Sequence, residues 1–136
     1  MLKRKIETEL EAFYASDERT ALLLTGARQV GKTFVVRETA KRRFRHVVEI
    51  NFIKNPKAKL LFADTTGEKD FFVLLSAMVG TPLVPGETLV FFDEVQECRE
   101  VATFIKFLVD DGRFRYVLSG SLLGIELNDL RSAPVG

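Results

Sequence analysis

The sequence is poor in the residues that build disulfide frameworks and metal clusters. Its 136 residues contain one cysteine, Cys98, one histidine, His46, and no tryptophan. A single cysteine forms no internal disulfide, and one Cys with one His is too few for a structural metal cluster. We interpret Cys98 as a small, partly buried side chain and His46 as the residue that begins a strand. These shortages exclude a disulfide-stabilised scaffold and a zinc module.

Long apolar runs and an excess of one charge are lacking as well. No hydrophobic stretch approaches the length of a membrane span, and residues 1–13 contain no signal-peptide core. The 20 basic and 19 acidic side chains leave a net charge of +1, which argues against a globally basic nucleic-acid-binding protein. We therefore expect a cytoplasmic, single-domain protein with no membrane partner.

What the sequence does contain is an alternation of helical and strand patterns. Apolar residues at helical spacing make the start of the chain an amphipathic helix. The predicted helices cover residues 1–15, 32–43, 69–79 and 101–111, with a short helix near 60–62 after the Asn55-Pro56 turn. The predicted strands cover residues 21–25, 46–52, 88–92 and 114–119. This alternation predicts an α/β fold with a mostly parallel sheet, whose ligands bind beyond the carboxyl ends of the strands.

The segment GARQVGKT, residues 26–33, lies between the first predicted strand and the second predicted helix. Its spacing is that of a P-loop, in which glycines permit a tight backbone whose N–H groups point at phosphates. Lys32 would reach the β- and γ-phosphates, and the Thr33 hydroxyl would ligate Mg²⁺. The alternative is a plain glycine turn. The expected nucleotide-binding residues are Gly26, Ala27, Arg28, Gln29, Val30, Gly31, Lys32 and Thr33.

Polar residues also end two later strands. Asp93-Glu94 follows the apolar run TLVFF, and Ser119-Gly120-Ser121 follows YVL. Because a buried strand tolerates no unpaired carboxylate, the acidic pair predicts a cation or open solvent nearby. Beside a P-loop, Asp93 would support Mg²⁺ and Glu94 would orient or deprotonate the attacking water. Ser119, ahead of Ser121, would contact the γ-phosphate or that water; a Ser-Gly turn is the alternative.

The remaining polar residues have simpler readings. We expect the side chains of Arg28 and Gln29 to face solvent, with contact to a partner or to the nucleotide as the alternative. Arg131 lies where an arginine finger would be possible but is not favoured. A basic cluster follows the second helix, and the simplest account is favourable cations near a helix C-terminus, with a nucleic-acid patch as the alternative. The cluster consists of Arg37, Lys41, Arg42, Arg43 and Arg45.

Together, GARQVGKT, FFDEVQEC and YVLSGSLLGIEL resemble the prokaryotic AAA-type ATPases of the AAA+ superfamily, in the group whose members usually carry an uncharacterised DUF-type C-terminal domain. INFIKNP, RSAPVG and the amphipathic start KRKIETEL fit the same group, so the resemblance spans nearly the whole chain. It implies a Rossmann-like, three-layer P-loop NTPase core that binds ATP and Mg²⁺. The matching residues are Gly26, Gly31, Lys32 and Thr33 for Walker A, Asp93 and Glu94 for Walker B, and Ser119 for sensor 1, which is often Asn.

The resemblance also implies a domain organisation. We expect an amphipathic helix in residues 1–18 and the nucleotide-binding core in residues 19–136, without the lid, its sensor 2 arginine or the C-terminal domain. Similar proteins have the strand order 5-1-4-3-2, and we expect this chain to stop before the fifth strand. Strand 21–25 would then be a sheet edge, and an uncovered apolar edge predicts self-association.

The leading functional prediction is an ATP-binding, Mg²⁺-dependent ATPase core that uses Glu94, Lys32 and Ser119 in catalysis and Thr33 and Asp93 as metal ligands. Turnover by this chain is expected to be weak, because arginine-finger and lid contributions are missing. One alternative is a non-hydrolysing, nucleotide-gated interaction module for DNA or protein. A less favoured one is a P-loop small-molecule kinase. A GTPase is disfavoured, since no glycine follows Asp93 by three residues and no N-K-x-D motif occurs.

Overall fold

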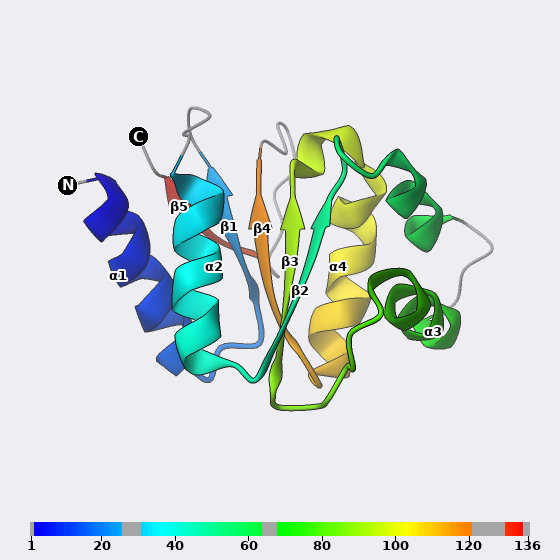
Figure 1. The fold of residues 1–136 in the computed structure, drawn as a ribbon, viewed down its shortest axis with the longest axis horizontal. Helices are drawn as coiled ribbons and strands as arrows, with labels where there is room; N and C mark the ends of the chain where they lie inside the picture. Colours follow the sequence, from blue (N-terminus) through cyan, green and yellow to red (C-terminus); the bar gives the residue numbers. More distant parts are fainter. Residues whose placement is uncertain (1, 26–30, 64–67, 121–129, 135–136) are drawn as a thin grey trace.

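The computed structural model describes residues 2–25, 31–63, 68–120 and 130–134, in which helices and strands alternate as the sequence predicts (Figure 1). In chain order the elements are α1 (Leu2–Ala15), β1 (Ala21–Thr25), α2 (Lys32–Arg43), β2 (His46–Asn51), the 3₁₀ helix η1 (Pro56–Phe62), α3 (Glu68–Val79), β3 (Thr88–Asp93), the 3₁₀ helix η2 (Val95–Glu97), α4 (Glu100–Asp111), β4 (Arg115–Ser119) and β5 (Leu130–Pro134).

The described strands form one sheet of five parallel strands in the order β2-β3-β4-β1-β5. The register sets the carboxyl ends of four strands level with one another. Asn51 of β2 is paired with Asp93 of β3, Asp93 with Ser119 of β4, and Ser119 with Leu24 of β1. The polar residues that end these strands therefore meet at one edge of the sheet, where parallel α/β folds bind ligands.

Helices cover both faces of the sheet, which confirms the three-layer α/β prediction. Figure 1 shows α1 and α2 on one face and α3 and α4 on the other. Strand side chains alternate between two apolar cores, as a pleated strand requires. Leu22 and Leu24 pack against α1 and α2, whereas Leu23 faces the core below α4. The amphipathic face of α1 is buried there at Ile6, Leu10 and Phe13.

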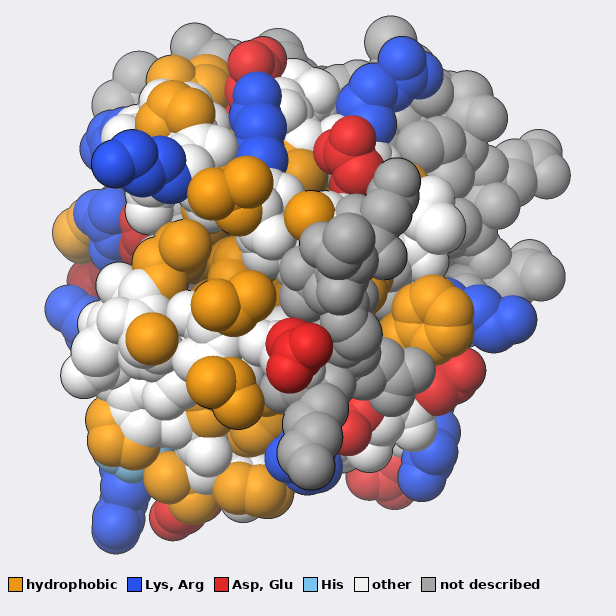
Figure 2. Space-filling view, turned by 90° about the vertical axis from the view of Figure 1, so that its right-hand side faces the viewer, with side chains coloured by type: hydrophobic (Ala, Val, Ile, Leu, Met, Phe, Trp, Pro, Cys, Tyr) orange, Lys and Arg blue, Asp and Glu red, His pale blue; other side chains and the backbone are white. Residues whose placement is uncertain are grey.

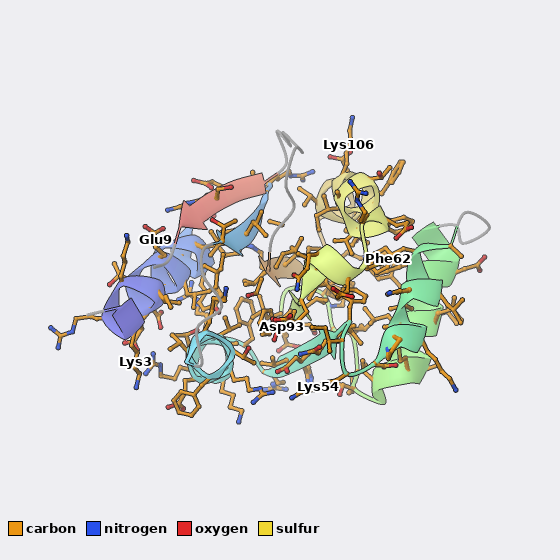
Figure 3. The ribbon with its side chains drawn as sticks, turned by 90° about the horizontal axis from the view of Figure 1, so that it is seen from above. Lys3, Glu9, Lys54, Phe62, Asp93 and Lys106 are labelled. Atoms are coloured by element: carbon orange, nitrogen blue, oxygen red, sulfur yellow. The ribbon has the colours of Figure 1, made fainter. Side chains whose placement is uncertain are left out.

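The core beneath α3 and α4 explains the heavy use of phenylalanine, which occurs twelve times. Phe62, at the end of η1, lies at its centre (Figure 3). Its ring centroid is 5.2 to 5.9 Å from those of Phe52, Phe71, Phe92 and Phe104. Aromatic pairs at such spacing are favourable beyond the area they bury. The cluster fixes η1 against the ends of β2 and β3.

The expectation that the chain stops before the fifth strand is wrong. Residues 130–134 form β5, which pairs with β1 in parallel from Ala21↔Leu130 to Thr25↔Pro134. β1 therefore lies between β4 and β5 and is not a sheet edge, so the reason for predicting self-association there is removed. The sequence LRSAP gives little strand signal, because it is polar and contains proline. An edge strand tolerates both features.

Smaller differences concern element ends. β3 extends one residue further than predicted, to Asp93, and the turn η2 after it was not predicted. The short helix predicted after the Asn55-Pro56 turn is confirmed as the seven-residue 3₁₀ helix Pro56–Phe62. α4 ends as expected, because Gly112 adopts the left-handed conformation with φ 73° that closes a helix. Among the described residues, none of the helices has the length and apolar character needed to cross a bilayer.

Exposed apolar side chains gather along α3 on the face that Figure 2 shows. Val73, Leu74 and Met78 project from α3 with 65%, 44% and 38% of their surface exposed. A shallow groove of about 500 Å³ runs beside them. It is lined by Phe72, Val73, Ser76, Ala77, Leu83, Arg113 and Phe114.

Candidate functional site

The candidate site lies at the carboxyl edge of the sheet, where α2 begins. Figure 3 looks down on this edge and shows Asp93 near its middle, between α2 and the layer of α3 and α4. β1 ends at Thr25, directly before GARQVGKT, and α2 starts at Lys32. The structure thus places Lys32, Thr33, Asp93 and Ser119 at one end of the sheet, as the sequence predicted for a parallel fold.

Thr33 and Asp93 are in direct contact. The Thr33 hydroxyl donates a hydrogen bond of 2.8 Å to Asp93 Oδ2, and the backbone N–H of Glu94 donates one of 3.0 Å to Asp93 Oδ1. Asp93 is buried, with 3% of its surface exposed. This burial raises the pKa of the Asp93 carboxyl above its usual value, and the hydrogen bond from Thr33 lowers it in part. A divalent cation at this carboxylate would offset the cost of burying its charge.

Lys32 and Gly31 form the described part of the predicted phosphate cradle. Lys32 is the first residue of α2 and is only 7% exposed, which is uncommon for a lysine. Gly31 precedes it as the N-cap, with φ −86° and ψ −7°, a conformation open to any residue. No described atom lies within 4 Å of the place where a Cβ on Gly31 would stand. Among the described residues, neither backbone strain nor packing explains this glycine.

Glu94 is held in an unusual conformation beside the end of β3. Its φ of 60° and ψ of 47° are left-handed, and among the described residues no other non-glycine residue has a positive φ. Such backbone strain is typical of functional sites. Its carboxylate Oε2 accepts a hydrogen bond of 2.9 Å from Gln96 Nε2. Glu94 therefore stands at the sheet edge next to Asp93, with its side chain oriented by Gln96.

Ser119 ends β4 with 1% of its surface exposed, one strand away from Asp93. The next residue, Gly120, donates its N–H to Leu24 O over 3.2 Å and has a φ of 135°. A Cβ on Gly120 would lie 2.9 Å from the backbone nitrogen of Val95 and would also collide with the Gln96 side chain. The ends of β1, β3 and β4 are thus packed closely around one small region.

Several predicted site residues lie outside the described residues. These are Gly26, Ala27, Arg28, Gln29, Val30 and Ser121. Within the described residues, no group of three or more His, Cys, Asp or Glu side chains is arranged to hold a metal ion.

Several of the other polar residues singled out in the sequence form ion pairs within the chain. Arg37 forms a two-pronged ion pair with Glu49, Arg42 faces Glu7 and Glu11, and Arg45 faces Glu87. Arg131, within β5, lies 3.7 Å from Glu9 and 3.5 Å from Glu18. Cys98 is buried more completely than expected, and burial, with Glu100 nearby, raises its pKa to about 11. This is the behaviour of an inert core thiol.

Sequence reasoning missed one residue of the site, Gln96. The stretch FFDEVQEC does not by itself indicate a role for Gln96. Its contact with Glu94 depends on the left-handed backbone conformation of Glu94. The signal available in the sequence was an amide two residues after an acidic pair. That signal is weak without the turn.

Comparison with known families agrees with this geometry. The family model described as AAA domain matches residues 18–136. The chain belongs to the AAA domain family. An AAA domain is of the P-loop NTPase type, which agrees with the parallel sheet and with the position of GARQVGKT between β1 and α2. The family indicates nucleotide binding for this AAA domain. A comparison with curated proteins gives no match.

Proposed function

We propose that this AAA domain binds Mg-ATP at the start of α2 and hydrolyses it with a water molecule activated at Glu94. The observation that carries the proposal is the 2.8 Å hydrogen bond between Thr33 and Asp93. It joins the last residue of GARQVGKT to the acidic end of β3. A glycine turn without a ligand gives no reason for a buried carboxylate to meet that threonine.

Binding of the nucleotide would depend on the first turn of α2. The helix N-terminus and the N–H groups of GARQVGKT favour phosphate oxygens. Lys32, held close to the sheet by its burial, would reach the β- and γ-phosphates. Gly31 leaves the space that a phosphate needs in order to approach the backbone. Each of these features would serve an anionic ligand.

Thr33 and Asp93 are the residues that would hold Mg²⁺. Both present oxygen atoms, which Mg²⁺ prefers, and both lie at the phosphate side of the sheet edge. The bound ion would neutralise charge that develops on the β- and γ-phosphates. The raised pKa of Asp93 is consistent with a carboxylate that has to be compensated by a cation.

Hydrolysis needs a base, and we assign this role to Glu94 because it directly follows Asp93 at the end of β3. Its carboxylate would accept a proton from a water molecule as the water oxygen bonds to the γ-phosphorus. The bond from the γ-phosphorus to the β,γ-bridging oxygen breaks at the same time, giving ADP and phosphate. Ser119, at the end of β4, would donate a hydrogen bond to the γ-phosphate or the water.

Calorimetric titration of Mg-ATP and Mg-GTP tests the binding step. We expect ATP to bind, and Lys32→Ala to abolish binding. Lys41→Ala is the matched control, because Lys41 is an exposed lysine on the same helix. Failure of the folded wild-type chain to bind ATP, or equal binding by Lys32→Ala, would reject the proposal.

Glu94→Gln separates an ATPase from the alternative of a nucleotide-gated interaction module for DNA or protein. In an ATPase the variant retains ATP and loses phosphate release. In a pure binding module the wild type releases no phosphate, and the substitution changes nothing. A small-molecule kinase would instead show phosphate transfer only when an acceptor is supplied. The hydrolysis assay with water as the only acceptor distinguishes it.

A further inference from the structure

The turn after β3 is built around the contact between Glu94 and Gln96. β3 ends at Asp93, Glu94 reverses the chain in the left-handed conformation, and Val95–Glu97 form the single turn η2. This path brings Gln96 back toward the residue two positions earlier. Its Nε2 donates a 2.9 Å hydrogen bond to Glu94 Oε2. The strained backbone of Glu94 is therefore accompanied by a side chain that fixes its carboxylate.

The other end of the Gln96 amide lies against the end of β4. Its Oε1 is buried and has no hydrogen-bond partner among the described residues. It occupies the place beside Gly120 where a side chain on that residue would begin. The amide is thus confined between the Glu94 carboxylate and the backbone that follows Ser119. This placement also sets the direction of the amide, because only the NH₂ group can face a carboxylate.

A purely structural role explains this arrangement poorly. Burying an amide oxygen without a partner among the described residues costs free energy, which offsets part of what the hydrogen bond to Glu94 contributes to the turn. The hydrogen bond instead orients Glu94, because a donor held in place restricts the rotation of the carboxylate. A base that transfers a proton in one step gains from being held in a single orientation.

We propose that Gln96 is a positioning residue that orients Glu94 toward the attacking water. The inference rests on the proposed ATPase function. Gln96 does not touch the nucleotide in this account and acts only through the Glu94 carboxylate. The amide also links the position of Glu94 to the end of β4, since any movement of the backbone at Gly120 would move the amide.

Gln96→Met is the decisive substitution, because methionine keeps the length and volume of glutamine and removes the N–H donor. We expect kcat for ATP hydrolysis to fall about tenfold or more, since hydrogen bonds to charged groups are among the stronger ones. The Kd for Mg-ATP should stay at the wild-type value, and the Tm should not fall, because the substitution also removes the buried oxygen that has no partner among the described residues. Gln96→Ala, which also lacks the donor and adds no charge beside Glu94, should lower kcat in the same way and serves if the methionine variant does not fold. Glu97→Gln, an exposed residue of the same turn, is the control.

A double-mutant cycle tests whether Gln96 acts through Glu94. In a Glu94→Gln background, Gln96→Met should cause no further loss in single-turnover hydrolysis, because the group that it orients is already gone. A full further loss would overturn the inference, and so would wild-type or faster hydrolysis by Gln96→Met alone. A wild-type chain that binds ATP without turnover would instead reject the proposed ATPase function, and this inference with it.

Discussion

Thr33 donates a 2.8 Å hydrogen bond to Asp93 across 60 positions of the sequence. The bond connects the first turn of α2 to the last residue of β3 and makes one site of two separate motifs. It also reveals a conflict in the folded chain. Asp93 is buried where its charge is unfavourable, and one hydroxyl and one backbone N–H only partly compensate it. The Mg²⁺ ion that we propose to bind here would supply the missing compensation.

Asp93→Asn should make the ligand-free protein more stable at neutral pH. Burial raises the pKa of Asp93 in the folded protein above its unfolded value of about 3.8. The folded protein therefore favours the protonated carboxyl, and this contribution to the free energy of unfolding is lost as the pH rises through the folded-state pKa. The variant cannot ionise and keeps that stability. Urea unfolding without Mg²⁺ should therefore show a difference in favour of Asp93→Asn that is absent near pH 3.8 and grows toward pH 7. A difference that does not change with pH would contradict this prediction.

Alanine substitution of Gly31 and of Gly120, the two glycines next to the site, should have different effects: the first should weaken Mg-ATP binding and the second should lower stability. Gly31→Ala should change the free energy of unfolding by less than about 0.5 kcal/mol, because its φ is negative and the space is open. It should weaken Mg-ATP binding at least tenfold by obstructing the approach of the phosphates.

Gly120→Ala is the matched variant. Its φ of 135° and the Val95 nitrogen at 2.9 Å predict a loss of about 1–3 kcal/mol in stability. Unfolding by urea and calorimetric titration measure both effects. A destabilised Gly31→Ala with normal ATP affinity would show that this glycine serves the fold instead of the ligand.

The left-handed backbone of Glu94 predicts a conflict between stability and activity. Glu94→Gly should raise the free energy of unfolding by about 1 kcal/mol, because glycine adopts φ 60° without the steric cost that other residues bear. The same change removes the carboxylate and should abolish hydrolysis. Glu94→Gln should lose hydrolysis without the gain in stability, since glutamine keeps the Cβ. Equal stability of the two variants would show that the backbone is not strained.

Phe62 should be the most sensitive position of η1. Phe62→Ala removes a ring that contacts four others and should cost about 3–5 kcal/mol. Leu60→Ala, in the same turn but 67% exposed, should cost about 0.5 kcal/mol or less. Thermal unfolding followed by circular dichroism compares the two variants. A similar loss in both would mean that the turn itself, and not the aromatic cluster, limits stability.

The sequence could predict the elements whose period is strong and the site residues that follow buried strands. The apolar run TLVFF predicts a buried strand, and the apolar face of α4 predicts a helix. The parallel topology then brings Asp93, Ser119 and the start of α2 together. β5 could not be predicted in the same way, because LRSAP has neither apolar alternation nor β-branched residues. The position of β5 depends on its backbone pairing with β1.

Gln96 was missed for a different reason. Its contact with Glu94 follows from one backbone angle at an acidic residue, and local propensity does not favour a positive φ for glutamate. Such conformations are imposed by the surrounding fold. Sequence reasoning therefore finds the residue types that chemistry needs, but it does not find the second residue that orients them.

The pairing of β5 with β1 gives the molecule a mechanical connection. Pro134 lies in register with Thr25, the last residue before GARQVGKT, and the two strands run parallel for five residues. A ladder of backbone hydrogen bonds resists sliding along the strand axis. A displacement of β5 along the strand axis would therefore be opposed as far as Thr25, the residue next to the start of GARQVGKT.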